Sequence, residues 1–293
     1  MIFLLLTIIT SASLVLIFKV FDKYQVPLFP AIVVNYLAAT ISAFIFLPDK
    51  SGVTNGSLFS HNWIPLAMGL GALFITIFNM VSITTVRFGV STASVAMKLG
   101  LVLPVLLAFT LYGEPFNWFK LLGIILAFVA VILSSIKEET EHHEHSKLSV
   151  LLPLLVFLGS GAADALTQLA NKQYVSKEGM EEFSFFLFLA AAIAGVVGFI
   201  IGLIRKQTSL PLKSIIGGTI LGVINYFSYF FMLKALASVN WGSSVLFPVI
   251  NLGTVAFATI VGVLLFREKI SKTNLAGLLF AAASISVILL SGK

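Results

Sequence analysis

The sequence has no cysteine and few charged side chains. Of its 293 residues only 10% are Asp, Glu, Lys or Arg, whereas 59% are hydrophobic and the mean hydropathy is +1.07. Without cysteine, disulfides, thiolate catalysis and cysteine-based metal sites are excluded. Such a composition does not describe a soluble domain. It indicates a protein that crosses a membrane several times.

Motifs for nucleotide hydrolysis and for acid-base chemistry are also missing. There is no G-x-x-x-x-G-K-[ST] loop, so an ATP-driven pump is not expected. The apolar runs contain no histidine and no paired carboxylates, which disfavours an integral-membrane enzyme. The net charge of +6 lies almost entirely in short loops and favours contact with anionic lipid over nucleic acid. We therefore expect no enzyme activity, no cofactor, no metal and no nucleic-acid partner.

Ten apolar runs are candidates for membrane-spanning helices, because about 20 residues cross a hydrocarbon core of ~30 Å. The sequence thus predicts an all-α membrane protein with ten transmembrane helices. The first run could also be a signal-peptide core, but a retained helix is favoured. The predicted bounds are 2–18, 28–47, 63–86, 90–112, 116–136, 148–172, 182–204, 212–237, 241–266 and 272–290.

Residues 137–147 form the only long, strongly polar connection, with five predicted helices on either side. We interpret it as a linker between a first repeat, residues 1–136, and a second repeat, residues 148–293. Its histidines, His142, His143 and His145, are better explained by a solvated tether than by a metal site. Because five is odd, two joined five-helix repeats must have opposite orientations in the membrane, as in many secondary transporters.

The two halves repeat a local sequence pattern as well. Leu-Tyr-Gly-Glu at 111–114 corresponds to Leu-Phe-Arg-Glu at 265–268, an offset of 154 residues. Upstream, Gly71 pairs with Gly222 at an offset of 151. In inverted repeats the substrate site lies near the membrane midplane between the halves.

The helix count, the glutamates that end the fourth and ninth helices and the glycines of the fifth and tenth resemble the drug/metabolite transporter superfamily, EamA type. The resemblance covers essentially the whole chain. It implies a multi-pass transporter with both termini in the cytoplasm, and we expect a monomer or homodimer in the inner (cytoplasmic) membrane. The distribution of positive charge contradicts this orientation. Six Lys and Arg residues lie on the face of the termini and eleven on the opposite face, and the positive-inside rule then places the termini outside.

Only two of the 30 acidic and basic side chains lie well inside apolar runs, namely Lys98 and Asp164. An ionisable group at such depth is costly unless it faces protein or water, so both are functional candidates. At ~1.5 Å per residue, Lys98 lies about 12 Å and Asp164 about 24 Å from their helix starts. This gap argues against a permanent salt bridge. We therefore predict that Asp164, with Gln168 one turn on, is a proton-coupling group that changes protonation between states.

Lys98 is the candidate for binding an acidic group of a substrate. It shares a helix face with Ser94, and Asn251 lies within two residues of its mate in the second repeat. A fourth-helix lysine is similar in nucleotide-sugar and sugar-phosphate transporters of the superfamily, where it binds an anionic group. The neighbours Met97 and Leu99 differ from those families, which argues against a nucleotide substrate. The alternative for Lys98 is snorkelling toward the membrane surface.

Other polar residues inside the apolar runs could line a substrate path. Singly, each asparagine is explained by an interhelical hydrogen bond, but together they favour a polar path. Two interior prolines, Pro104 and Pro248, are expected to act as hinges. The remaining substrate-binding candidates are Asn35, Asn79, Asn225, Tyr229 and Ser244.

We therefore expect a secondary active transporter, an exporter or permease, for a small polar or amphipathic metabolite. It would work by alternating access, with proton coupling or exchange. The first alternative is a broad exporter of lipophilic or aromatic compounds, in which the 27 phenylalanines dominate and Lys98 is structural. The second, from another class, is an integral-membrane enzyme that modifies lipids.

Overall fold

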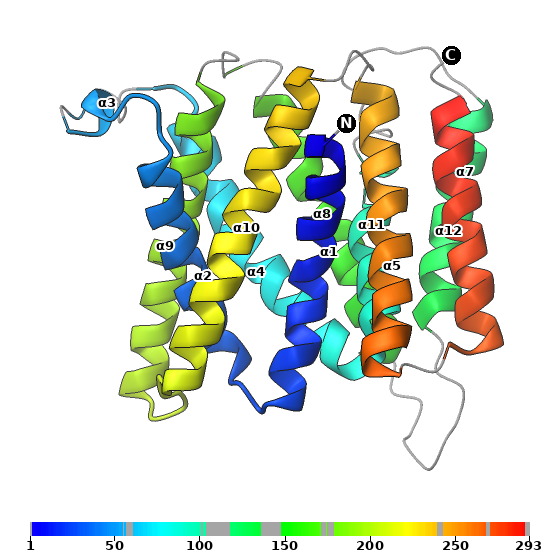
Figure 1. Ribbon diagram of the computed structural model, residues 1–293, viewed down its shortest axis with the longest axis horizontal. Helices are drawn as coiled ribbons and strands as arrows, with labels where there is room; N and C mark the ends of the chain where they lie inside the picture. The colour runs from blue at the N-terminus through cyan, green and yellow to red at the C-terminus, as the bar shows by residue number, and fades with distance from the viewer. Residues whose placement is uncertain are drawn as a thin grey trace. The chain divides into compact units, whose positions relative to one another are not determined.

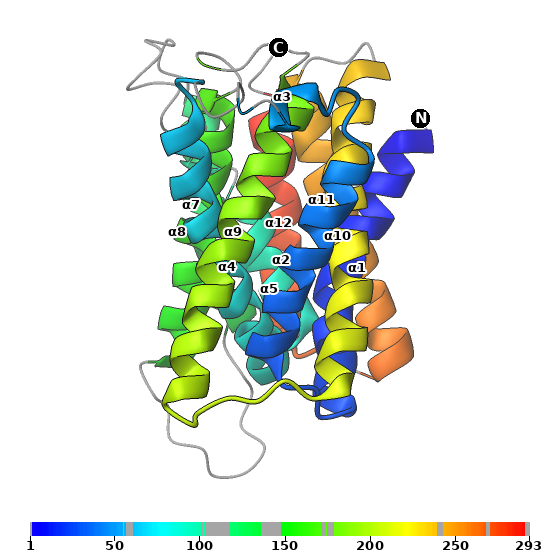
Figure 2. The same ribbon diagram turned by 90° about the vertical axis from the view of Figure 1, so that its left-hand side faces the viewer.

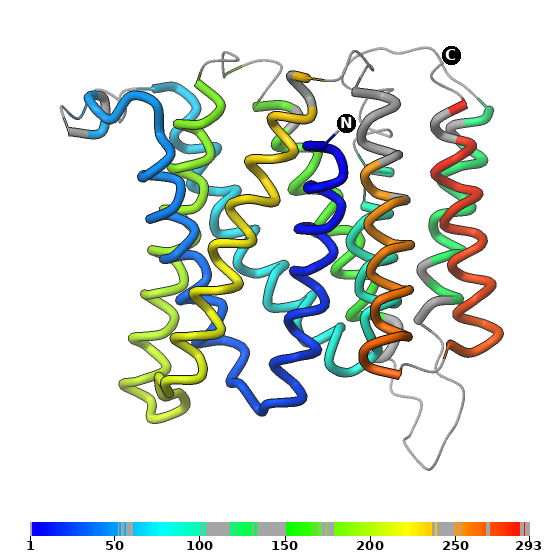
Figure 3. Tube along the Cα trace, viewed as in Figure 1, coloured from blue at the N-terminus to red at the C-terminus, as the bar shows by residue number. Residues whose placement is uncertain are grey.

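A computed structural model shows the chain as a set of long helices (Figures 1 and 3). The structure describes residues 2–54, 56, 61–100, 102–103, 118–135, 148–170, 174, 179–238, 243–267 and 270–290. The polar linker, Pro104 and both repeat glutamates lie outside these residues.

The helices occur where the apolar runs predicted them. In the first half they are α1 (Ile2–Lys23), α2 (Leu28–Ile45), the short α3 (Ser51–Thr54), α4 (Ile64–Phe88), α5 (Val90–Leu99) and α7 (Trp118–Ser135). In the second half they are α8 (Leu148–Leu169), α9 (Met180–Ile204), α10 (Leu212–Ser238), α11 (Ser243–Phe266) and α12 (Lys272–Leu290). Among the described residues every regular element is a helix and each of the ten predicted runs contains one, so the all-helical prediction is confirmed.

Within the described residues, five helices are long and apolar enough to cross a membrane by length and composition. They are α1, α2, α4, α9 and most of α10, and shorter apolar stretches occur in α7, α8, α11 and α12. Large aliphatic side chains lie exposed on several helices, for instance Ile204 and Leu264. Such exposure is expected where a helix faces lipid, because lipid tails are as apolar as these side chains.

A single glycine separates α4 from α5. Gly89 has a φ of +93°, a conformation that glycine adopts without the steric penalty of a side chain. Its backbone N–H donates to the carbonyl of Thr85, and α5 begins at the next residue. This abrupt turn fixes where α5 starts and therefore where Lys98 lies.

The chain divides into two compact units, each built from both sides of the linker. Unit 1 comprises Met1–Val20, Met80–Asp164 and Ser228–Lys293, and unit 2 comprises Phe21–Asn79 and Ala165–Phe227. Within unit 1, α7 packs against α12 and α5 against α11. Within unit 2, α2 packs against α9, and these two helices lie side by side in Figure 2. Each of these pairs joins a helix of one half to the helix five positions later in the order of ten.

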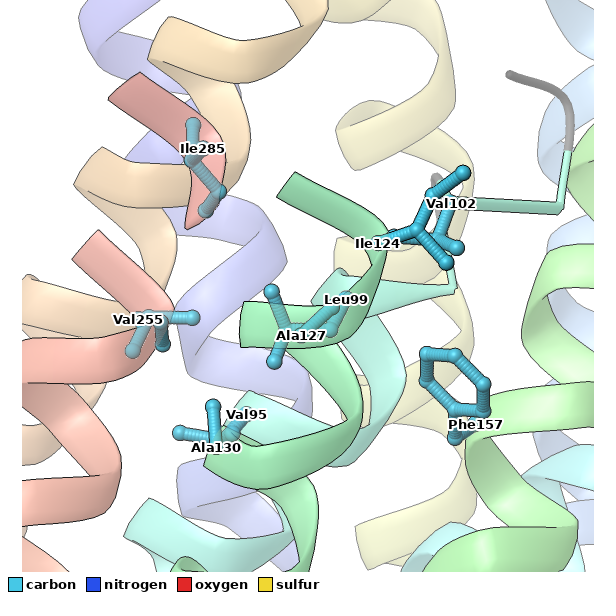
Figure 4. Close-up of a cluster of buried hydrophobic side chains, with 10 residues drawn as sticks. Val95, Leu99, Val102, Ile124, Ala127, Ala130, Phe157, Val255 and Ile285 are labelled. Carbon is cyan, nitrogen blue, oxygen red and sulfur yellow. The ribbon is translucent and has the colours of Figure 1, made fainter. Parts of the chain in front are cut away.

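The core of unit 1 lies where α5, α7, α8, α11 and α12 meet (Figure 4). Small residues allow α7 and α12 to approach closely, because Ala127 and Ala281 are both buried in this core. The hydroxyl of Ser284 donates to the carbonyl of Gly123 across the same pair, at 2.7 Å. The remaining members of the core are Val95, Leu99, Val102, Ile124, Ala130, Phe157, Val255 and Ile285.

Unit 2 contains two equivalent glycine contacts. A Cβ at Gly71 would meet the carbonyl oxygen of Leu187 and the Cβ of Ala190, and one at Gly222 would meet the carbonyl oxygen of Asn35 and the Cβ of Ala38. The two glycines are 151 residues apart, and both partner pairs are 152 apart. The α4–α9 contact therefore recurs as the α10–α2 contact.

Replacing Gly71 with alanine is expected to destabilise the protein by about 1–3 kcal/mol, because the new methyl group overpacks the contact with α9. A Cβ there would lie 2.6 Å from both Leu187 O and Ala190 Cβ. Gly69, on the same helix, has no atom within 4 Å of an added Cβ, so Gly69→Ala is the matched control. Thermal unfolding of the purified variants measures the difference. Equal stability of the two variants would contradict the close packing.

Candidate functional site

The predicted site residues divide between the two units. Unit 1 contains Lys98, Ser94, Asp164, Tyr229, Ser244, Pro248 and Asn251, and unit 2 contains Asn35, Asn79, Gln168 and Asn225. Of Ser244, Pro248 and Gln168 the structure describes the backbone only, within α11 and α8. Pro104, the second predicted hinge, lies outside the described residues.

Two glycines bring together, in unit 1, the helices that carry the two charges predicted to lie inside the membrane. A Cβ added to Gly100, just after α5, would lie 2.6 Å from the backbone nitrogen of Gly161 in α8. The backbones of these two segments therefore touch, which only residues without side chains allow. Lys98 precedes the first glycine by two residues and Asp164 follows the second by three. The two side chains are near enough for their charges to interact.

The predicted difference in depth between Lys98 and Asp164 was too large. Lys98 lies two residues before the glycine contact and Asp164 three residues after it. Their difference in depth is therefore five residues of helical rise, about 8 Å rather than about 12 Å. Helix starts are a poor common reference, because α5 begins immediately after a glycine turn whereas α8 begins beyond a long linker. The glycine pair is a better reference because it fixes one level on both helices.

The charged groups lie close without being bonded to each other. No ion pair within 4 Å and no hydrogen bond to either group occurs among the residues that the structure describes. Asp164 is exposed although it lies well inside α8, and Lys98 is partly buried. A carboxylate facing lipid would be strongly unfavourable, so this position is expected to face protein or water.

Buried hydroxyl groups lie on the same two helices as the charged pair. Ser91 and Ser94 lie on the face of α5 that carries Lys98, and Ser160 lies one turn before Asp164 on α8. Their hydroxyl oxygens are buried and have no partner within the described part of the chain. Buried polar groups are normally satisfied by protein, water or ligand. The site can therefore supply a cation, an anion and several neutral hydrogen-bonding groups to a small polar molecule.

The asparagines of unit 2 bond partly to the protein, while the side-chain nitrogen of Asn35 has no hydrogen-bond partner among the described residues. The side-chain amide of Asn225 donates to the side-chain oxygen of Asn35 at 3.3 Å, and Asn79 donates to the carbonyl of Ile75 in its own helix at 2.8 Å. Asn35 and the neighbouring Tyr36 are completely buried. Asn35 and Asn225 therefore form an interhelical hydrogen bond between α2 and α10.

Replacing Asn225 with alanine is expected to lower stability by about 0.6–1.7 kcal/mol, the range measured for hydrogen bonds between membrane helices. Thermal unfolding measures this loss. Comparison with Asn225→Asp, which keeps an oxygen but no amide donor, separates the hydrogen bond from side-chain volume. Unchanged stability of both variants would show that the hydrogen bond between Asn35 and Asn225 does not stabilise the protein. A changed affinity for a ligand would support the predicted role of Asn225 in substrate binding.

Sequence reasoning missed the glycines that build the site. Gly100 and Gly161 have no side chain that could act as a functional group. Their contact depends on a helix crossing that no local sequence pattern predicts. One signal was present: Gly100 pairs with Gly253 at an offset of 153, between the offsets of 151 and 154 found elsewhere in the repeat.

Comparisons with known proteins agree with this architecture. The EamA-like transporter family matches residues 151–290. An uncharacterized protein of Haemophilus influenzae is 31% identical over 285 residues, which cover 96% of this chain and 95% of that protein. A crystal structure of a protein with 15% sequence identity has a TM-score of 0.62, covers 99% of this chain and 96% of that chain, and thus shares the fold.

Members of this family are membrane transporters of the drug/metabolite type rather than enzymes, and the apolar helices agree with a multi-pass membrane protein. The chain belongs to the EamA-like transporter family.

Proposed function

We propose that this protein is a secondary active transporter, located in the inner (cytoplasmic) membrane, for a small polar or amphipathic metabolite that carries an acidic group. The carrying observation is the unbonded pair of Lys98 and Asp164 beside buried hydroxyl groups without partners. Lys98 binds the acidic group of the substrate, with Ser94 as a neighbouring hydrogen-bond donor. A cation that is held near an anion, but not bonded to it, is available to a ligand.

Residues 1–136 and 148–293 act as two inverted five-helix repeats. Support comes from the packing of α2 with α9, α5 with α11 and α7 with α12. Two helices that are related by a two-fold axis contact each other when both lie next to that axis. The recurring contact of Gly71 and Gly222 supports the same relation. Alternating access then exposes the site to one side of the membrane at a time.

Asp164 couples transport to protons. When it is ionised, its charge compensates Lys98, and when it is protonated, the charge of Lys98 is free for a substrate anion. Proton and anion therefore favour each other's binding. Gln168, four residues after Asp164 in the sequence, is proposed to assist proton coupling, and Pro104 and Pro248 are proposed as hinges of the fourth and ninth helices.

The alternative of a lipophilic or aromatic exporter depends on the aromatic residues. In unit 2 these rings pack on each other: Tyr36 lies 5.8 Å from Phe78 and 6.5 Å from Phe188 between ring centroids. Phe46 likewise stacks on Tyr226 at 5.7 Å. Rings that are engaged with other rings form a core, so the polar site of unit 1 is the better candidate for substrate binding.

A thermal-shift screen against a metabolite panel tests the proposal. A ligand at 100 times its Kd is expected to stabilise the protein by about 2.7 kcal/mol. We expect stabilisation by anionic metabolites in preference to neutral aromatic compounds. Stabilisation by neutral aromatic compounds alone would favour the lipophilic exporter instead.

A further inference from the structure

At the repeat-related position in unit 1, a glycine of α11 packs against a side chain of α1 rather than against its backbone. A Cβ added to Gly253 in α11 would lie 2.6 Å from Cδ1 of Ile8 in α1. Gly253 is 153 residues after Gly100, and Gly161 is 153 residues after Ile8. The crossing of α1 with α11 is thus the counterpart of the contact that joins α5 and α8.

The same offset assigns a counterpart to each charged residue. Lys98 corresponds to Asn251 on α11, and Asp164 corresponds to Ser11 on α1. The charged pair at one crossing is therefore matched by a neutral polar pair at the other. Ser228 of α10 adds a second hydroxyl there, because its oxygen lies 2.9 Å from that of Ser11.

The two crossings differ in exposure. Asp164 is exposed and Lys98 is partly buried, whereas Ser11 is only 6% exposed and Asn251 only 8%. Asp164 and Lys98 are therefore more exposed than their counterparts Ser11 and Asn251 in the other half.

The two crossings differ in hydrogen bonding as well. At the charged crossing the hydroxyl of Ser160 has no partner among the described residues. Its counterpart at the offset of 153, Thr7, donates to the carbonyl of Phe3 in its own helix. The hydroxyls of Ser11 and Ser228 satisfy each other. The two serine hydroxyls of the neutral crossing are thus satisfied by each other, while the hydroxyl of Ser160 at the charged crossing is not satisfied by the described residues.

We propose that Ser11, Ser228 and Asn251 form a second polar site, closed in this state, that takes an uncharged hydrogen-bonding group of the substrate, a hydroxyl or an amide. This inference rests on the inverted-repeat transporter proposed above. When inverted repeats exchange conformations, the closed crossing opens and the open one closes. The neutral site then meets water on the side of the membrane opposite to that of the charged site. Opening it separates Ser11 from Ser228 and frees both hydroxyls.

Single-cysteine labelling tests this directly, because the natural chain contains no cysteine. Ser11→Cys, Asn251→Cys and Asp164→Cys are made singly in the full chain. Each is treated with the membrane-impermeant cationic reagent MTSET in right-side-out and in inside-out vesicles. Asp49→Cys, at an exposed loop position, reports the orientation of the vesicles. Ala12→Cys, beside Ser11 and completely buried, is the matched control.

We expect Asp164→Cys to react from one side and Ser11→Cys and Asn251→Cys from the other, each at least about tenfold faster than from its disfavoured side. The factor follows because a minor state populated at about 10% or less slows labelling correspondingly. Ala12→Cys is expected to stay unlabelled.

Labelling of all three variants from the same side would overturn the second site. The same holds if Ser11→Cys and Asn251→Cys fail to react while Asp164→Cys reacts, or if Ala12→Cys reacts as fast as Ser11→Cys. Failure of Asp164→Cys to react from either side would instead count against the charged site and the proposed function. Ser228→Cys provides a second variant at the same site should Ser11→Cys fail to fold.

Discussion

Replacing Lys98 with glutamine is expected to weaken the binding of an anionic substrate by about 10- to 100-fold, because a hydrogen bond to a charged group contributes roughly 1.5–3 kcal/mol. Glutamine keeps a hydrogen-bond donor of similar length but carries no charge. Binding of neutral compounds should therefore change little. Titration of purified protein with a ligand from the thermal-shift screen measures both affinities.

The control for this variant is Lys50→Gln, which removes one positive charge at an exposed position before α3. It should bind the anionic ligand with the affinity of the wild type. If Lys98→Gln loses affinity equally for anionic and neutral ligands, or loses none, the lysine does not bind the acidic group. The presence of Lys98 in an apolar run would then be explained by snorkelling of its side chain to the membrane surface.

Replacing Asp164 with asparagine is expected to abolish accumulation of substrate by a pH gradient while substrate exchange continues. If one proton is carried with each substrate, each pH unit of gradient allows up to about tenfold accumulation of substrate. The reason is that a tenfold concentration ratio and one pH unit correspond to the same free energy. Asparagine is nearly isosteric but cannot gain or lose a proton, so accumulation should fall to equality across the membrane. Uptake into proteoliposomes with an imposed gradient measures the ratio.

Counterflow without a pH gradient serves as the control, since it requires substrate binding and alternating access but no coupling. A variant that still concentrates substrate along with the proton gradient would show that Asp164 is not the coupling group. If the wild type itself ignores the gradient, the protein is an exchanger or a facilitator.

The helices could be predicted from sequence because each is an apolar run of the length that spans a membrane. For example, the run predicted at 272–290 coincides with α12, and that predicted at 212–237 differs from α10 by one residue. Lys98 and Asp164 could be singled out for the same reason, since a charge is conspicuous in an apolar run, and their position inside the membrane remains a prediction.

Their proximity was not predictable from local sequence. It depends on Gly100 and Gly161, two residues from different halves whose backbones touch. The hydrogen bond between Ser11 and Ser228 likewise joins residues that are far apart in the chain. Helical periodicity assigns residues to a face of one helix, but it does not say which helix faces that side. Contacts of this kind follow from tertiary packing alone.

The central claim is that the protein carries a small anionic metabolite through the site of Lys98 and Asp164. The most direct measurement loads proteoliposomes with a metabolite extract, imposes a pH gradient and identifies by mass spectrometry what leaves. We predict selective release of a few anionic metabolites by the wild type, little release by Lys98→Gln and no gradient-driven release by Asp164→Asn. Release no faster than from protein-free liposomes, or an identical profile for all three proteins, would contradict the claim.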